Sequence, residues 1–153
     1  MLGGFEELSP VDIAASEAFL SGLGFTPLQV GIEKRVLDNG AGIGRVVKDL
    51  FMSKNLFSRI DVSEPCTTFT AELRRIEGIG SVFEVPLQDL IPSANTYHLI
   101  WNQWVLLYLS DEDLVTFLVR CRTALLEGGI LCAKENVIID KRRQEAVDEE
   151  VCR

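Results

Sequence analysis

The sequence has little of what marks membrane, secreted or metal-binding proteins. It contains no apolar run of the roughly 18 residues that a membrane helix needs, and its first residues lack the basic start and apolar stretch of a signal peptide. The cysteines are far apart, without the close pairs of zinc sites or disulfide frameworks. We therefore expect a soluble, intracellular protein that has no metal site and whose thiols are free: Cys66, Cys121, Cys132 and Cys152.

Basic residues are also scarce, because 15 lysines and arginines stand against 23 aspartates and glutamates, for a formal net charge of -8. A general nucleic-acid binder needs cationic side chains to displace the counterions of the phosphates. The composition therefore argues against a nucleic-acid partner, and a basic partner is more plausible.

The chain contains alternating strand and helix patterns. Its 153 residues, 47% of them hydrophobic, suffice for one domain with a packed interior, which we expect over residues 1–153, with a first helix at about 10–22 and a core at about 35–137. Strands are predicted at 35–38, 57–61, 82–85, 97–104 and 130–133, and helices after the glycine turn at 40–44, at 64–77 and from 110 until Gly128 and Gly129. Such alternation predicts an α/β fold with a mostly parallel sheet covered by helices on both faces.

The glycine turn follows the first predicted strand. Gly40, Gly42 and Gly44 let the chain turn sharply and let a ligand approach bare backbone. A dinucleotide fingerprint would need a glycine where Arg45 stands, which disfavours a pyrophosphate ligand. Asp61, at the predicted end of the second strand, is placed to accept hydrogen bonds from both hydroxyls of a ribose. S-adenosylmethionine (SAM) offers a ribose without phosphate; the alternative is a structural turn beside a solvated aspartate.

More specific segments accompany this turn. They are 37–45 around the turn, 61–63, Leu-Gln-Asp at 87–89, 100–105 with Gln-Trp-Val at its end, Lys-Glu-Asn at 134–136, Val-Cys-Arg at 151–153 and the opening 1–5. In this order and spacing they resemble the protein α-N-terminal methyltransferases, class I enzymes that transfer methyl groups from SAM to the free α-amine of proteins beginning Xaa-Pro-Lys or a close variant. The resemblance implies a Rossmann-like SAM methyltransferase fold, S-adenosylhomocysteine as the product, and a cytoplasmic or nuclear location.

The resemblance also implies contacts to the cofactor. The methionine portion would lie beside Gly40, Gly42 and Arg45, the ribose beside Asp61, and the adenine beside Leu87 and Gln88. Gln103 would lie beside the cofactor, and Ser63 is a further cofactor residue. Some of these residue types have plainer uses, because a leucine suits any core and a glutamine can simply satisfy backbone groups. His98 and Trp101 fall outside the family's functional positions and are expected to be structural.

For the peptide, the resemblance implies that protein N-termini with a basic third residue are the partners, with no nucleic acid or membrane involved. The implied contacts are Trp104 against the first residues, Leu2 and Leu8 beside the proline, Asn136 near the amine, and Glu145 and Asp148 on the basic residue or the amine. The two acids would share one face of a helix, although a solvated acidic tail is the alternative interpretation.

Methyl transfer needs a neutral amine aimed at the methyl carbon. An α-amine has a pKa near 8, so a weak base suffices. Asp148 is the first candidate for the proton acceptor, with Asn136 near the amine. Members of the family carry a histidine where this chain has Tyr108, whose hydroxyl would orient the amine or a water instead.

The family's sheet has seven strands, whereas the pattern here predicts five, and the family has helices before the segment equivalent to 1–4. We therefore expect a truncated chain with most of the SAM pocket, but without the peptide lid and the last sheet edge. Two alternatives stay open: a SAM enzyme that acts on a small molecule, and an inactive fragment that only binds SAM.

Overall fold

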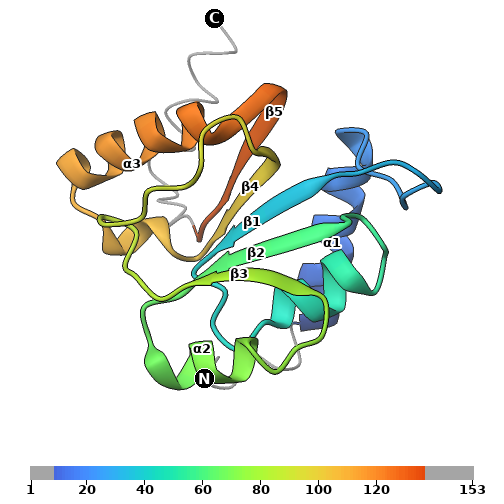
Figure 1. The fold of residues 1–153 in the computed structure, drawn as a ribbon, viewed down its shortest axis with the longest axis horizontal. Coiled ribbons are helices and arrows are strands. Elements are labelled where there is room, and N and C mark those ends of the chain that lie inside the picture. The colour runs from blue at the N-terminus through green and yellow to red at the C-terminus, as the bar shows by residue number, and fades with distance from the viewer. Residues whose placement is uncertain (1–8, 137–153) are drawn as a thin grey trace, which may run out of the picture.

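The computed structural model describes residues 9–136, which form a parallel sheet with helices on both faces (Figure 1). The elements in chain order are α1 (Ser9–Gly22), β1 (Arg35–Asn39), the π-helical segment η2 (Val47–Met52), β2 (Arg59–Ser63), α2 (Thr67–Leu73), β3 (Ile79–Phe83), β4 (Tyr97–Gln103), the 3-10 turn η3 (Leu106–Tyr108), α3 (Asp111–Ala124) and β5 (Leu125–Lys134). This arrangement confirms the predicted α/β class.

The five strands lie in the order β3-β2-β1-β4-β5, and every neighbouring pair is parallel. The chain therefore builds the sheet outward from β1 in one direction and then returns to β4 on its other side. Ligands of such open sheets bind beyond the carboxyl ends of the strands where the direction reverses. The reversal at β1 and β4 places the expected site directly above the glycine turn.

Two apolar clusters pack against the two faces of the sheet. On the face that α1, η2 and α2 cover, Phe51 meets Trp101 edge-on with ring centroids 6.2 Å apart. On the other face, Phe117 and Cys121 of α3 pack against Leu37 of β1. Trp101 is 1% exposed, as a structural core residue should be.

The helix that follows the fourth strand begins as its sequence indicates, because the Ser110 hydroxyl accepts a hydrogen bond from the Asp113 N–H (3.2 Å). Its end differs from the prediction. Gly128 and Gly129 lie inside β5, which begins at Leu125 and pairs with β4 through a register shift. A Cβ on Gly129 would lie 2.8 Å from the Tyr97 carbonyl oxygen, so this glycine allows the two strands to approach each other rather than ending a helix.

Between residues 9 and 136, no helix is both long and apolar enough to cross a membrane. The same residues contain no group of three or more histidine, cysteine or acidic side chains arranged to hold a metal ion.

Candidate active site

The glycine turn is built from three residues in the left-handed region, with φ values of 67° at Gly40, 56° at Gly42 and 81° at Gly44. A Cβ on Gly40 would lie 2.6 Å from Cγ2 of Val105, and one on Gly44 would lie 2.7 Å from Cδ1 of Ile76. These two glycines therefore let the turn pack closely against its neighbours. A Cβ on Gly42 would meet nothing within 4 Å, so the backbone there is open to a ligand.

Two cavities flank this turn and share Gly40. The first, of about 150 Å³, lies over the turn and is lined by Asp38, Gly40, Gly42, Arg45, Gln103 and Trp104, among others. The second, of about 190 Å³, is lined by Gly40, Ser63, Leu87, Gln88 and Tyr108, among others. The structure thus gathers seven of the eight predicted cofactor residues around one cleft, with those assigned to the methionine portion on one side of Gly40 and those assigned to the adenine on the other.

Asp61 is the exception, because it is fully buried in the middle of β2 and lines neither cavity. Its Oδ2 accepts hydrogen bonds from Arg35 Nε (2.6 Å) and the Tyr97 hydroxyl (3.1 Å), while Oδ1 accepts one from the Ser81 N–H (2.7 Å). Burial, together with the neighbouring Asp61 charge, raises the pKa of Tyr97 well above its usual range. The prediction that Asp61 reaches a ribose does not fit this geometry, since its side chain is 0% exposed and lies two residues before the end of β2.

Glu64 occupies the position that the prediction gave to Asp61. It follows the last residue of β2 and is 8% exposed, and its Oε2 accepts a hydrogen bond from the Gly42 N–H (2.9 Å). Its other oxygen accepts one from the Cys66 N–H (2.9 Å). The sequence held a usable signal, because the residue before Pro65 favours extended backbone and so marks Glu64 as the end of the strand.

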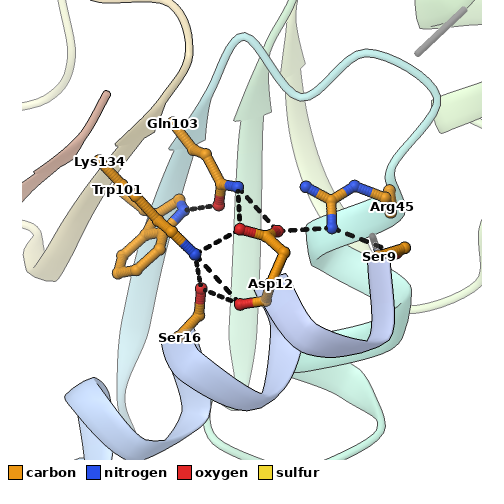
Figure 2. A network of polar contacts seen from close by, with 7 residues as sticks. All are labelled: Ser9, Asp12, Ser16, Arg45, Trp101, Gln103 and Lys134. Atoms are coloured by element: carbon orange, nitrogen blue, oxygen red, sulfur yellow. Dashed lines mark hydrogen bonds and ion pairs between the residues drawn. The ribbon is translucent and has the colours of Figure 1, made fainter. Parts of the chain in front are cut away.

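Arg45 belongs to a polar network that connects α1 to the cleft (Figure 2). Its Nη1 lies 2.8 Å from Oδ2 of Asp12, and its guanidinium carbon lies 5.4 Å from the centroid of the Trp104 ring. Gln103 and Lys134 contact the same carboxylate. Although burial raises the pKa of Asp12, the hydrogen bonds from Lys134, Gln103 and Arg45 outweigh it and hold that pKa below the usual value.

Asp38, which contributes a carboxyl group to the lining of the first cavity, is 2% exposed, and its Oδ2 has no hydrogen-bond partner among the described residues. Burial raises the pKa of Asp38 to about 8, although the positive charge of Arg45 acts in the opposite direction. At neutral pH this carboxyl group, at the wall of the first cavity, is therefore mostly protonated.

Trp104 has an unusual backbone for a bulky residue, with φ at 55°. The conformation is held from β5 and the residue after it. The Trp104 N–H donates to the Lys134 carbonyl (2.9 Å), and the next two N–H groups, of Val105 and Leu106, donate to one oxygen of Glu135 (2.9 and 2.8 Å). The Lys-Glu pair therefore fixes the direction in which the Trp104 ring enters the cleft.

Some of the remaining site predictions fall within the described residues and others do not. Tyr108 is 79% exposed and lines the second cavity, whereas Trp104 lines the first. Asn136 is exposed at the end of the described residues. His98 has a structural contact, because its Nδ1 accepts a hydrogen bond from the Arg35 N–H (3.1 Å). The predictions for Leu2, Leu8, Glu145 and Asp148 lie outside the described residues.

A ladder of side chains crosses the sheet directly beneath the cleft. The Ser63 hydroxyl donates to Asn39 (2.8 Å), the Asn39 amide donates to Asn102 (2.9 Å), and the Asn102 amide donates to the Cys132 carbonyl (2.9 Å). These four residues come from β2, β1, β4 and β5 in turn. The floor of the cleft is therefore tied together across four strands by side chains as well as by the backbone.

Solved structures with this fold establish the class of protein. A SAM-dependent methyltransferase of Leishmania major superposes with a TM-score of 0.77 at 34% identity, over 88% of this chain and 53% of that protein. A putative SAM-dependent methyltransferase of Methanococcus maripaludis shares the fold with a TM-score of 0.68 at 16% identity, over 94% of this chain and 64% of that protein. The fold and the cleft above the glycine turn are those of a SAM-dependent methyltransferase with a Rossmann-like sheet.

Sequence relatives narrow the assignment further. The N-terminal Xaa-Pro-Lys N-methyltransferase 1-A of Xenopus laevis is 38% identical over all of this chain and 70% of its own length, and the alpha N-terminal protein methyltransferase 1 of Caenorhabditis elegans is 43% identical over 94% of this chain and 62% of its own length. A model of the AdoMet-dependent proline di-methyltransferase family matches residues 1–153. The chain belongs to this family and spans about two thirds of the length of these two relatives.

Proposed function

We propose that this chain takes part in transferring methyl groups from SAM to the free α-amine of proteins that begin Xaa-Pro-Lys or a similar sequence. The observation that carries the proposal is the pair of cavities that meet at Gly40, with Arg45 on one side and Leu87 on the other. Family membership supplies the reaction, because relatives are named for this activity.

The residues present suit SAM in charge and shape. Arg45 would bind the cofactor's carboxylate, and the open backbone at Gly42 leaves room for the methionine chain. Glu64, rather than Asp61, would accept the ribose hydroxyls, because it contacts the Gly42 N–H and stands between Ser63 and Pro65, which both line the second cavity. The apolar Leu87 and the amide of Gln88 would hold the adenine in the second cavity. When bound, SAM supplies a methyl group activated by a sulfonium.

The contribution of the protein is chiefly to hold the amine in line with that methyl group, because an α-amine is already partly neutral near pH 7. Trp104, fixed by Glu135, would flank the first residues of the peptide, and Asn136 would contact the peptide near its amine. Asp148 remains our candidate for the proton acceptor, with the Tyr108 hydroxyl orienting the amine or a water.

Preference for a basic third residue is part of the same proposal and is consistent with the net charge of -8. The proposal also includes that the chain has no nucleic-acid or membrane partner. It further includes a cytoplasmic or nuclear location, which fluorescent tagging in cells would test.

The test combines binding with turnover. Calorimetry should show S-adenosylhomocysteine binding to the 153-residue chain. Transfer of labelled methyl groups should then occur to a peptide beginning Ser-Pro-Lys, but not to one beginning Ser-Gln-Lys or to an N-acetylated Ser-Pro-Lys peptide. Equal labelling of the first two peptides, or labelling of small metabolites instead, would contradict the proposed substrate. Binding without any labelling would identify a cofactor-binding chain that lacks catalysis.

A further inference from the structure

Asp12 of α1 is the point at which the first helix meets the cleft, although it lines neither cavity. Its side chain is 9% exposed and accepts hydrogen bonds from three residues of other elements (Figure 2). These are Arg45 after the glycine turn, Gln103 at the end of β4 and Lys134 at the end of β5. Two of the three, Arg45 and Gln103, line the first cavity.

The bond to Asp12 determines how Arg45 presents its guanidinium. Both hydrogen bonds that Arg45 donates within the described residues come from Nη1, to Asp12 Oδ2 (2.8 Å) and to the Ser9 hydroxyl (3.3 Å). With Nη1 held by α1 and the guanidinium carbon over the Trp104 ring, Nε and Nη2 remain for a carboxylate of the ligand. The guanidinium is thus held both by a charged hydrogen bond and by a cation–π contact.

Asp12 also orients the amide of Gln103. The amide nitrogen donates to both oxygens of Asp12 (3.0 and 2.8 Å), and the amide oxygen accepts from the Trp101 indole N–H (3.2 Å). The two partners make opposite demands on the amide, so a single orientation satisfies both. Without Asp12, the nitrogen of Gln103 would lose the acceptor that holds it in place.

The charges at this corner make the arrangement depend on Asp12. Arg45 and Lys134 are both cations, with side chains 13% and 30% exposed, and Asp12 forms an ion pair with each of them. Removing the Asp12 carboxylate would leave these two partly buried cations without their counter-charge, and the side chains of Arg45 and Lys134 would turn towards solvent.

We propose that Asp12 is a positioning residue for the amino-acid portion of the cofactor, and that it acts through Arg45 and Gln103 without contacting the ligand. This inference rests on the proposed function, because it assumes that the carboxylate of SAM lies against Arg45. It assigns to α1 a role in cofactor affinity that neither cavity's lining shows.

Two ligands test the inference by calorimetry on the 153-residue chain. S-adenosylhomocysteine carries the amino-acid portion, whereas methylthioadenosine has the same nucleoside and thioether without it. Asp12→Asn should weaken S-adenosylhomocysteine binding at least about tenfold, the scale of one charged hydrogen bond, and change methylthioadenosine binding less than about twofold. Glu17→Gln is the matched control, because Glu17 lies on the same helix in an exposed ion pair with Lys54 (2.8 Å) and should change neither affinity.

A double-mutant cycle identifies the route. In an Arg45→Met background, Asp12→Asn should weaken S-adenosylhomocysteine binding less than it does in the parent chain, because only the route through Gln103 remains. Equal weakening of both ligands by Asp12→Asn, no weakening of S-adenosylhomocysteine, or additive effects in the cycle would each overturn the inference.

If circular dichroism shows that Asp12→Asn does not fold, Asp12→Glu replaces it, since it keeps the charge but displaces the carboxylate by one methylene. The same ligand-selective loss is expected, on the order of threefold, and an equal loss for both ligands overturns the inference. Failure of the unaltered chain to bind either ligand would instead reject the proposed function itself.

Discussion

The buried carboxyl group of Asp38 makes the stability of this fold depend on pH in an unusual direction. Aspartate has an ordinary pKa of 3.8, and burial raises the pKa of Asp38 to about 8 in the folded chain. Between these two values the folded state keeps a proton that the unfolded state has lost. The free energy of unfolding should therefore fall as pH rises through this window, whereas most carboxylates with partners have the opposite effect.

The magnitude follows from one proton. A single group contributes a slope of at most about 1.4 kcal/mol per pH unit, so its contribution between pH 5 and pH 7 is at most about 3 kcal/mol. Asp38→Asn replaces the protonated carboxyl group with an amide of the same shape that does not ionise. The stability of this variant relative to the parent should therefore be nearly constant below about pH 4 and should rise steadily up to about pH 8.

Urea unfolding followed by tryptophan fluorescence measures this difference, because Trp101 is buried in the core beside β1. All other titrating groups are shared by the two proteins, so their contributions cancel in the comparison. The region below about pH 4 serves as the internal control, because the parent and the Asp38→Asn variant there both carry a neutral side chain at position 38. A difference that stays flat from pH 5 to pH 8 would instead show that Asp38 is ionised in the folded chain.

Two further pairs of variants separate fold from site. Asp61→Ala should lower the free energy of unfolding by about 3–5 kcal/mol, because it leaves Arg35 and Tyr97 without their acceptor, and should leave S-adenosylhomocysteine affinity unchanged in protein that remains folded. Glu64→Gln should do the reverse, weakening that affinity about tenfold with little change in melting temperature; loss of affinity in Asp61→Ala alone would return the ribose to Asp61. Gly40→Ala should unfold more easily, since its new Cβ would lie 2.6 Å from Val105, and thermal melting checks this. Gly42→Ala meets no neighbour within 4 Å, so it should lose only about 1–2 kcal/mol from its positive φ while the added methyl weakens ligand binding in calorimetry; equal melting of the two glycine variants would contradict the assignment.

The strands, their direction and the glycine turn could be predicted because each is encoded in a short stretch of sequence. The same locality explains why the predicted and observed positions of Asp61 differ. A strand predicted at 57–61 is observed at Arg59–Ser63, and this shift of two residues moves Asp61 from the end of the strand into its middle. The observed register pairs Asp61 with Leu37, well below the turn, while Glu64 reaches Gly42.

Other features of the site depend on contacts between distant parts of the chain. The carboxylate of Asp12 meets Gln103 across 91 residues of sequence and Lys134 across 122, and no local pattern indicates such a meeting. In sequence, Asp12 is simply an acid in the first turn of a helix, a position that the helix dipole alone explains. The prediction that Gly128 and Gly129 end a helix was wrong for a related reason, because the register shift in which they lie arises only from the pairing of β5 with β4.

The side-chain ladder from Ser63 through Asn39 and Asn102 to Cys132 has a mechanical consequence. The hydrogen bonds all run in the same direction across the sheet, so displacement of the end of β1 or β4 would break a bond on either side of it. The ends of these four strands should therefore stay in place together when a ligand binds. Conformational change on binding is then expected in the segments above the strand ends, namely the turn at Gly42 and residues 104–108. In the second segment, the left-handed backbone of Trp104 already stores conformational strain.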